Sequence, residues 1–340
     1  MPPENPPLLS LVVPHRNHLH CLPRLLDSIL AQNFKGLEVV LVDDHSDEPC
    51  GTLVEAWRRK GLDIVLLEHR ERIYTMGARL AGIRAARGEI IGFADADDLL
   101  WGTEALGRNV ALFLQERPDI LHFRSVLIDA NGVFRDYAPD PNSDPWALML
   151  EGAEIFKTYS KTYLYASSSL WNKLFSREIG LTVCNIVQKT SVRRYSEDTY
   201  LSILFTFHSR KYSGSPHVGY GHHYEEEKKY TEAAERAVNH RNTLQELIPW
   251  LKDHGCPEES VAWCAHGLQQ LLCVSVGHMS IAVGRQGKTS VSDTVLDHLL
   301  DQTDEDTLLE TLLLGNSLNT QKILKTYPAL FPKPDFGGAR

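Results

Sequence analysis

Residues 8–46 read LLSLVVPHRNHLHCLPRLLDSILAQNFKGLEVVLVDDHS, two short apolar runs separated by a segment with helical periodicity. The apolar runs Leu8–Val13 and Leu37–Val42 are each closed by polar residues or proline, which is typical of buried strands. Between them, leucine and isoleucine recur every three or four residues from Leu19 to Leu30, which predicts a crossover helix. A strand, a helix and a second strand in this order form a βαβ unit with parallel strands.

The same alternation of strand and helix continues to about residue 100. Apolar runs at Ile64–Leu67 and Glu89–Ala94 predict two further strands, and Gly77–Arg87 reads as a helix ended by a glycine. Four strands alternating with helices predict an α/β fold with a doubly wound sheet, whose ligands bind at the carboxyl ends of the strands. The carboxylates expected at those ends are Asp43, Asp44, Asp95 and Asp97.

The pattern changes in the second part of the chain. A helix over Glu104–Gln115 and a strand over Ile120–Ile128 are followed by a turn at Asn131-Gly132. Residues 139–145 are rich in proline and aspartate, and we expect a mobile loop there. From Thr231 to about Leu324 the residues favour helices, so we expect a helical C-terminal extension.

Composition excludes several classes of function. The chain has 340 residues and a formal net charge of -9, which argues against the basic surface that a nucleic acid partner needs. Its six cysteines show neither a CxxC pair nor zinc-ligand spacing, so we expect reduced thiols. No secretory signal and no apolar run long enough to span a bilayer are visible. We therefore expect a cytoplasmic protein, with at most peripheral contact at the inner face of the membrane.

The acidic cluster Asp95-Ala96-Asp97-Asp98 follows directly after an apolar strand. Two carboxylates separated by one residue at a strand end can bind a hard divalent cation and leave positions for diphosphate oxygens and water. Such triplets are common, however, and taken alone Asp97 or Asp98 is more often the cap of a following helix.

Neighbouring motifs change that interpretation. Val12-Val13-Pro14, Val40 to Ser46, and Gly77 to Ile83 precede the acidic cluster in a fixed order. Together these motifs resemble the family-two inverting glycosyltransferases of the GT-A fold, of the bacterial surface-polysaccharide type, over roughly residues 8–225. The family often has asparagine after the arginine of the middle motif, whereas Leu80 stands there in this chain.

The resemblance implies a fold, an activity and partners. The fold would be a GT-A-type doubly wound mixed sheet with flanking helices. The enzyme would move a sugar from a nucleotide-sugar donor, best a UDP-sugar, to a hydroxyl of a glycan or lipid-linked glycan acceptor. A divalent cation, Mn²⁺ or Mg²⁺, would assist, and a single displacement would invert the anomeric centre.

The resemblance also assigns residues to the donor and the metal. Asp97, with Asp95, matches the metal-binding carboxylates. Arg79 matches a basic residue near the nucleotide, and an arginine offers a forked donor set to a diphosphate. The donor-binding set is Pro14, Asp43, Asp44, Arg79, Asp95 and Ala96. Taken alone, Asp43 and Asp44 can equally be residues of a solvated turn.

Further residues are assigned to the base and the acceptor side. Asp198, the second member of the pair Glu197-Asp198, matches the general base, although Ser196-Glu197-Asp198 alone more often begins a helix. Trp171, Asn172 and Lys173 resemble a tryptophan-asparagine-lysine segment of many such enzymes, and with Glu197 they are candidate acceptor-side residues. The indole of Trp171 can equally belong to the core.

His222 and His223 are candidate diphosphate contacts, although a pair of loop histidines bonded within the protein is the commoner case.

This interpretation divides the chain into a nucleotide-sugar-binding half (1–100), an acceptor-binding half of the same domain (101–225) and a helical C-terminal region (226–340). Two alternatives stay open. A catalytically silent nucleotide- or sugar-binding module would use the same fold. A receiver-type phosphoacceptor domain would also have an acidic pair after a strand, but the chain has no lysine between Lys60 and Lys157 to complete such a site.

Overall fold

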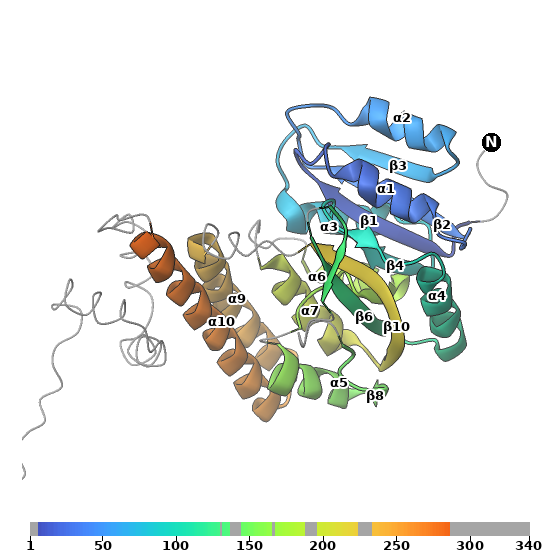
Figure 1. The fold of residues 1–340 in the computed structure, drawn as a ribbon. Helices are drawn as coiled ribbons and strands as arrows, with labels where there is room; N and C mark the ends of the chain where they lie inside the picture. Colours follow the sequence, from blue (N-terminus) through green and yellow to red (C-terminus); the bar gives the residue numbers. More distant parts are fainter. Residues whose placement is uncertain are drawn as a thin grey trace, which may run out of the picture. The chain divides into compact units, whose positions relative to one another are not determined.

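The computed structural model describes residues 6–129, 131–136, 144–164, 167–187, 196–223 and 233–285. The chain separates into two compact units, residues 1–224 with 249–264, and residues 225–248 with 265–340. The first unit contains all of the described strands (Figure 1). All candidate site residues also belong to it. The functional division at residues 100 and 225 stays a prediction.

A mixed sheet forms the centre of the first unit. Its spatial order is β3-β2-β1-β4-β9-β6-β10-β5, with β7 paired to β6 and β8 to β10. The strands are β1 Leu9–His15, β2 Leu37–Asp43, β3 Asp63–Glu68, β4 Ile90–Phe93, β5 Leu99–Leu100, β6 Ile120–Ile128, β7 Phe134–Asp136, β8 Met149–Glu151, β9 Lys173–Ser176 and β10 Lys211–His223.

The two halves of this sheet differ in strand direction. β3, β2, β1 and β4 are parallel, as the βαβ pattern of the sequence predicts. β9 then runs antiparallel to both β4 and β6, whereas β10 is parallel to β6 and antiparallel to β5. The predicted doubly wound mixed sheet is therefore confirmed.

Helices connect and cover the strands. The helix predicted from Glu104 begins within one residue of its expected position, whereas the helix predicted from Gly77 begins three residues earlier, at Tyr74. Within residues 233–285, two helices lie in the predicted C-terminal helical region. The rest of that region, and residues 139–143 of the predicted mobile loop, lie outside the described residues. The helices are α1 Leu22–Leu30, α2 Gly51–Arg59, α3 Tyr74–Ala85, α4 Ala105–Glu116, α5 Ala153–Thr158, the π-helical turn η1 Tyr159–Tyr163, α6 Arg177–Ile186, α7 Glu197–His208, α9 Ala233–Asp253 and α10 Glu258–Arg285.

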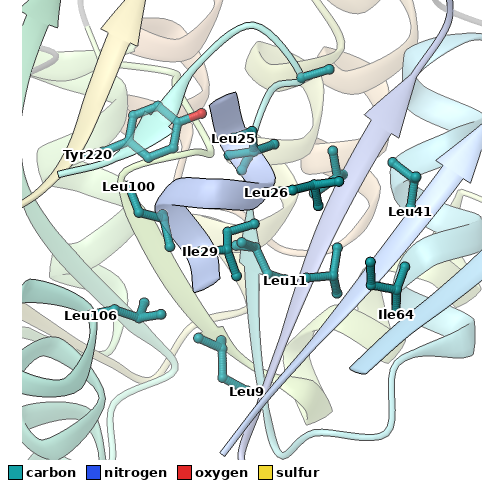
Figure 2. Close-up of a cluster of buried hydrophobic side chains, with 14 of the residues drawn as sticks. Leu9, Leu11, Leu25, Leu26, Ile29, Leu41, Ile64, Leu100, Leu106 and Tyr220 are labelled. Carbon is teal, nitrogen blue, oxygen red and sulfur yellow. The ribbon is translucent and has the colours of Figure 1, made fainter. Parts of the chain in front are cut away.

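One face of the sheet carries the main hydrophobic core. Alternate residues of β1 point to this face, and Leu9 and Leu11 meet Leu25, Leu26 and Ile29 of α1 (Figure 2). All five side chains are buried. Alternate residues of the strand share one face, and every third or fourth residue of the helix shares one face, so each element presents an apolar face to the other. Each contributes about 1.5–3 kcal/mol to folding.

The opposite face of the parallel strands is covered by α3, which approaches β1 very closely. A Cβ atom at Gly82 would overlap the side chain of Val12, so only glycine fits at this contact. α3 also packs on α6, where Ile83 lies beside Gly180. This close packing fixes the position of Arg79, one turn before Gly82 on α3.

Candidate active site

Asp43 ends β2 at the edge where the parallel strands finish, and Asp44 follows it directly. Asp43 Oδ1 accepts hydrogen bonds from the backbone nitrogen and the hydroxyl of Ser46, at 3.0 and 2.6 Å. Asp44 Oδ1 accepts from the backbone nitrogen of Ile73 at 2.5 Å, just before α3. Both side chains are buried, so they shape the two loops that border this edge. Pro14 lies opposite Val42 in the register, is partly exposed, and belongs to the same edge.

The acidic cluster forms a turn after β4, held by a bond from the backbone nitrogen of Asp98 to the carbonyl of Asp95 at 3.1 Å. Asp95 and Asp97 are partly exposed, whereas Ala96 and Asp98 are buried. The residues that follow form β5, so the helix-cap interpretation of this cluster is wrong. A guanidinium nitrogen of Arg24 on α1 donates to the carbonyl oxygen of Asp97 and steadies the turn.

Asp98 joins this turn to the end of β10. Its carboxylate accepts from the Tyr220 hydroxyl at 2.7 Å, from the backbone nitrogen of His223 at 2.7 Å, and from His222 Nδ1 at 3.2 Å. The Tyr220 hydroxyl in turn accepts from the backbone nitrogen of Asp95 at 2.9 Å. A single buried carboxylate therefore organises the turn that carries the two exposed ones.

The surroundings of His222 favour its protonated form. Burial alone would lower its pKa, but the charge and hydrogen bond of Asp98, with the charges of Asp95 and Asp97, raise the pKa to about 8. The Trp171 ring stacks on the His222 ring at 4.7 Å between centroids. A positive group held beside two carboxylates suits an anionic ligand such as a diphosphate.

Arg79 lies beneath the acidic turn, with only 4% of its side chain exposed. Its Nη2 donates to Asp95 Oδ1 at 2.9 Å, and its Nε donates to Glu197 Oε1 at 3.3 Å. Nη1 is buried without a hydrogen-bond partner among the described residues. Leu80, at the position where the family often has asparagine, is buried. Arg79 therefore connects α3, the acidic turn and α7.

The pair Glu197-Asp198 begins α7, and its two members differ in environment. Glu197 is buried; burial and the charge of Asp198 raise its pKa to about 7, while Arg79 opposes this shift. Asp198 is partly exposed, and its Oδ1 accepts from the backbone nitrogen of Thr199 at 2.8 Å. Asp198 lies in the first turn of α7, as the helix-start interpretation predicts. A helix terminus is rigid, so it can also hold a general base in a fixed position.

Three predicted acceptor-side residues lie in the interior instead. Asn172 and Lys173 are 0% and 2% exposed, and Glu197 faces Arg79. Their burial removes the direct acceptor contact that the sequence suggested. Trp171 is partly exposed and stacks on Tyr220 as well as on His222. Because both of these residues bond Asp98, Trp171 lies beside the acidic turn.

The carboxylates fit a divalent cation shared with a ligand. Within the described ranges, no group of three or more His, Cys, Asp or Glu residues forms a metal site by itself. Asp95 and Asp97 supply hard oxygen ligands, and six-coordinate Mg²⁺ or Mn²⁺ would take the rest from phosphate and water. Burial raises the pKa of Asp95. The charge of Arg79 opposes this shift, whereas the charges of Asp98 and Asp97 add to it. A bound cation would favour the ionised carboxylate.

Tyr220 was not predicted from the sequence, and Asp98 was considered only as a member of the acidic cluster or a helix cap. Tyr220 and His222 stand two apart on one strand and therefore share a face, which was the available signal.

In the described part of the chain, no helix is long and apolar enough to cross a bilayer.

Known proteins resemble this chain in sequence. "Uncharacterized glycosyltransferase EpsJ" of Bacillus subtilis is 35% identical over 92 residues, 27% of this chain and 26% of that protein. "UDP-Glc:alpha-D-GlcNAc-diphosphoundecaprenol beta-1,3-glucosyltransferase WfgD" of Escherichia coli is 25% identical over 126 residues, 37% of this chain and 49% of that protein. In both cases the chain spans half the relative's length or less.

Solved structures resemble it in fold. S. aureus TarS 1-349 superposes with a TM-score of 0.60 at 18% identity, covering 94% of this chain and 91% of that one, and a UDP-GlcNAc complex of TarS gives 0.58 at 18% identity with the same coverage. The mannosyltransferase PcManGT of Pyrobaculum calidifontis, in complex with GDP-Man and Mn²⁺, gives 0.53 at 16% identity, covering 96% and 86%.

The family model described as Glycosyl transferase family 2 matches residues 10–179, half of the 340-residue chain. The match begins in β1 and covers the acidic turn. A receiver-type phosphoacceptor domain is thereby excluded. The chain belongs to glycosyl transferase family 2.

Proposed function

We propose that this enzyme transfers a sugar from a UDP-sugar donor to a hydroxyl of a glycan or lipid-linked glycan, with inversion at the anomeric carbon. One observation carries the proposal. The buried Arg79 bonds both Asp95 of the acidic turn and Glu197, the neighbour of Asp198, so a cation-binding pair and a candidate base are held by one ion-pair network.

The donor half of the site would consist of the acidic turn and the loops after β1 and β2. Asp97, with Asp95, would hold Mn²⁺ or Mg²⁺, which when bound neutralises the charge that develops on the departing diphosphate. His222 lies beside this turn with a positive charge and would contact the diphosphate, with His223 next to it. Pro14, Asp43, Asp44 and Ala96 would shape the pocket for the nucleoside.

Related proteins support the choice of substrates. TarS structures contain UDP and UDP-GlcNAc, and the name of WfgD gives UDP-Glc as donor and a diphosphoundecaprenol-linked GlcNAc as acceptor. PcManGT was solved with GDP-Man and Mn²⁺. A lipid-linked acceptor would bring this chain to the cytoplasmic face of a membrane as a peripheral protein.

The chemical step would use Asp198 as general base. Its carboxylate takes the proton of the acceptor hydroxyl as that oxygen attacks the anomeric carbon, and the bond from this carbon to the diphosphate oxygen breaks. General base catalysis contributes typically ~10² to 10⁴ in rate. Arg79 and Glu197 would hold the start of α7 in place during the step.

Replacement of Asp198 tests the proposal. Release of UDP from a panel of UDP-sugars is measured with Mn²⁺ and candidate acceptors, and the anomeric configuration of the product is determined by NMR. Asp198→Asn should bind UDP like the wild type and lose transfer, whereas Asp253→Asn, at an exposed site at the end of α9, should keep full activity. Full transfer by Asp198→Asn would refute the base assignment. A wild type that binds donor and never transfers would favour a silent binding module.

A further inference from the structure

Lys173 is a buried lysine at the first residue of β9, between β4 and β6 in the sheet. Its side chain is among the largest fully buried ones. The ammonium nitrogen donates to the carbonyl oxygen of Ser169 at 2.5 Å and to Asn172 Oδ1 at 3.0 Å. Within the described residues, no carboxylate lies within ion-pair distance of it.

Such a placement is energetically unfavourable for a lysine. Burial lowers the pKa of Lys173 to about 7, and the charge of Asp198 opposes this shift. On the β6 side stands His122, which burial and the charge of Lys173 keep neutral by lowering its pKa. The Trp146 ring lies 5.4 Å from the ammonium. The charge of Asp198 therefore favours the ammonium form of Lys173.

The groups around Asp198 come from several elements. Arg79 on α3, Glu197 on α7, Tyr159 in η1 and Lys173 on β9 all interact electrostatically with it. The charge of Arg79 is shared with Asp95 and Glu197 through direct bonds. Among these described neighbours, Lys173 is the cation whose charge is not shared with a second carboxylate.

Hydrogen bonds also connect Lys173 to α7. The segment that it holds includes Ser168, whose carbonyl oxygen accepts from the Ser202 hydroxyl at 2.9 Å. Ser202 lies four residues after Asp198, on the same face of α7. The ammonium thereby fixes the segment against which the Asp198 face of the helix packs.

We propose, on the basis of the base role given to Asp198 in the proposed function, that Lys173 is a positioning residue for that base. It holds residues 167–172 against α7 and supplies an unshared positive charge that stabilises the ionised carboxylate of Asp198. Lys173 touches neither donor nor acceptor, because its side chain is buried.

The pH dependence of transfer tests this role. The rate kcat/KM is measured from acidic to neutral pH for the wild type, Lys173→Gln, Lys173→Met and Lys173→Arg. Below pH 7 the ammonium is charged, so its removal in the Gln and Met variants should move the midpoint of the acidic limb upward by at least about half a pH unit. Lys173→Arg keeps the charge and should keep the wild-type midpoint.

The glutamine variant keeps hydrogen-bond donors and the methionine variant keeps the apolar volume, so their folding is checked separately by thermal unfolding. UDP affinity with Mn²⁺ should be unchanged in both. A lower rate with an unmoved midpoint in the variants that fold would overturn the proposal and leave Lys173 a structural residue. Full activity of Asp198→Asn would instead refute the base assignment, so the two failures are distinguishable.

Discussion

Replacing Asp98 by asparagine should destabilise the fold in a pH-dependent way. The side chain of Asp98 is 1% exposed and accepts three hydrogen bonds, from Tyr220, His222 and His223. Asparagine has the same shape but offers one acceptor oxygen and a new donor group, which would face hydrogen-bond donors. The His222 imidazolium would then be left without its carboxylate.

The magnitude follows from the titration of His222. Its pKa rises from 6.5 to about 8 on folding, which corresponds to about 2 kcal/mol of stability. Because the folded pKa is the higher one, this contribution is complete below pH 6.5 and is lost as the pH rises through 8. Breaking a buried charged pair costs about 3–5 kcal/mol in all. We therefore expect Asp98→Asn to lose about 3–5 kcal/mol near pH 6 and roughly 2 kcal/mol less near pH 9.

Urea denaturation of the wild type, Asp98→Asn and the control Asp253→Asn at these two pH values measures the difference. The control should match the wild type at both. A loss in Asp98→Asn that is equal at the two pH values would refute the Asp98–His222 linkage, even if the variant were less stable.

Two further substitutions test the surrounding architecture. Arg79→Lys should lower both transfer rate and thermal stability, because an ammonium cannot bond Asp95 and Glu197 as the forked guanidinium does; unchanged kinetics would show that the network is dispensable. Gly82→Ala should lower the free energy of unfolding, measured in urea, by about 1–3 kcal/mol, because the added Cβ would overlap Val12. Gly107→Ala on α4, where a Cβ has room, should be neutral or slightly stabilising. Equal effects of the two substitutions would contradict the close packing of α3 on β1.

The parallel half of the sheet and the two partly exposed carboxylates of Asp95 and Asp97 could be predicted from the sequence. Largely apolar runs such as Leu37–Val42 in a βαβ pattern are typical of buried parallel strands. Asp95 and Asp97 were predicted at a strand end, where they lie partly exposed, because the neighbouring motifs argued against a helix cap; their role as metal ligands stays a prediction.

Long-range contacts account for what the sequence did not predict. β9 inserts antiparallel between β4 and β6, and nothing local in its four residues, which begin with a buried lysine, indicates either partner. Asp98 meets Tyr220 across 122 residues of sequence, and Arg79 meets Glu197 across 118. Burial of Arg79 and Glu197 depends on their mutual contact, and that of Asn172 on His122, 50 residues away. Residue type and motif spacing alone therefore suggested exposed roles.

Calorimetric titration of UDP tests the metal-bridged donor site most directly. Neither ligand should bind well alone, because the cation has few protein ligands and the diphosphate would meet unscreened carboxylates at Asp95 and Asp97. With Mn²⁺ the wild type should bind UDP at least about tenfold more tightly than with chelator, about 1.4 kcal/mol, and reciprocity requires UDP to tighten Mn²⁺ binding equally. Asp97→Ala should fold normally and show no such coupling. Equal affinity of the wild type for UDP with Mn²⁺ and with chelator would contradict the account.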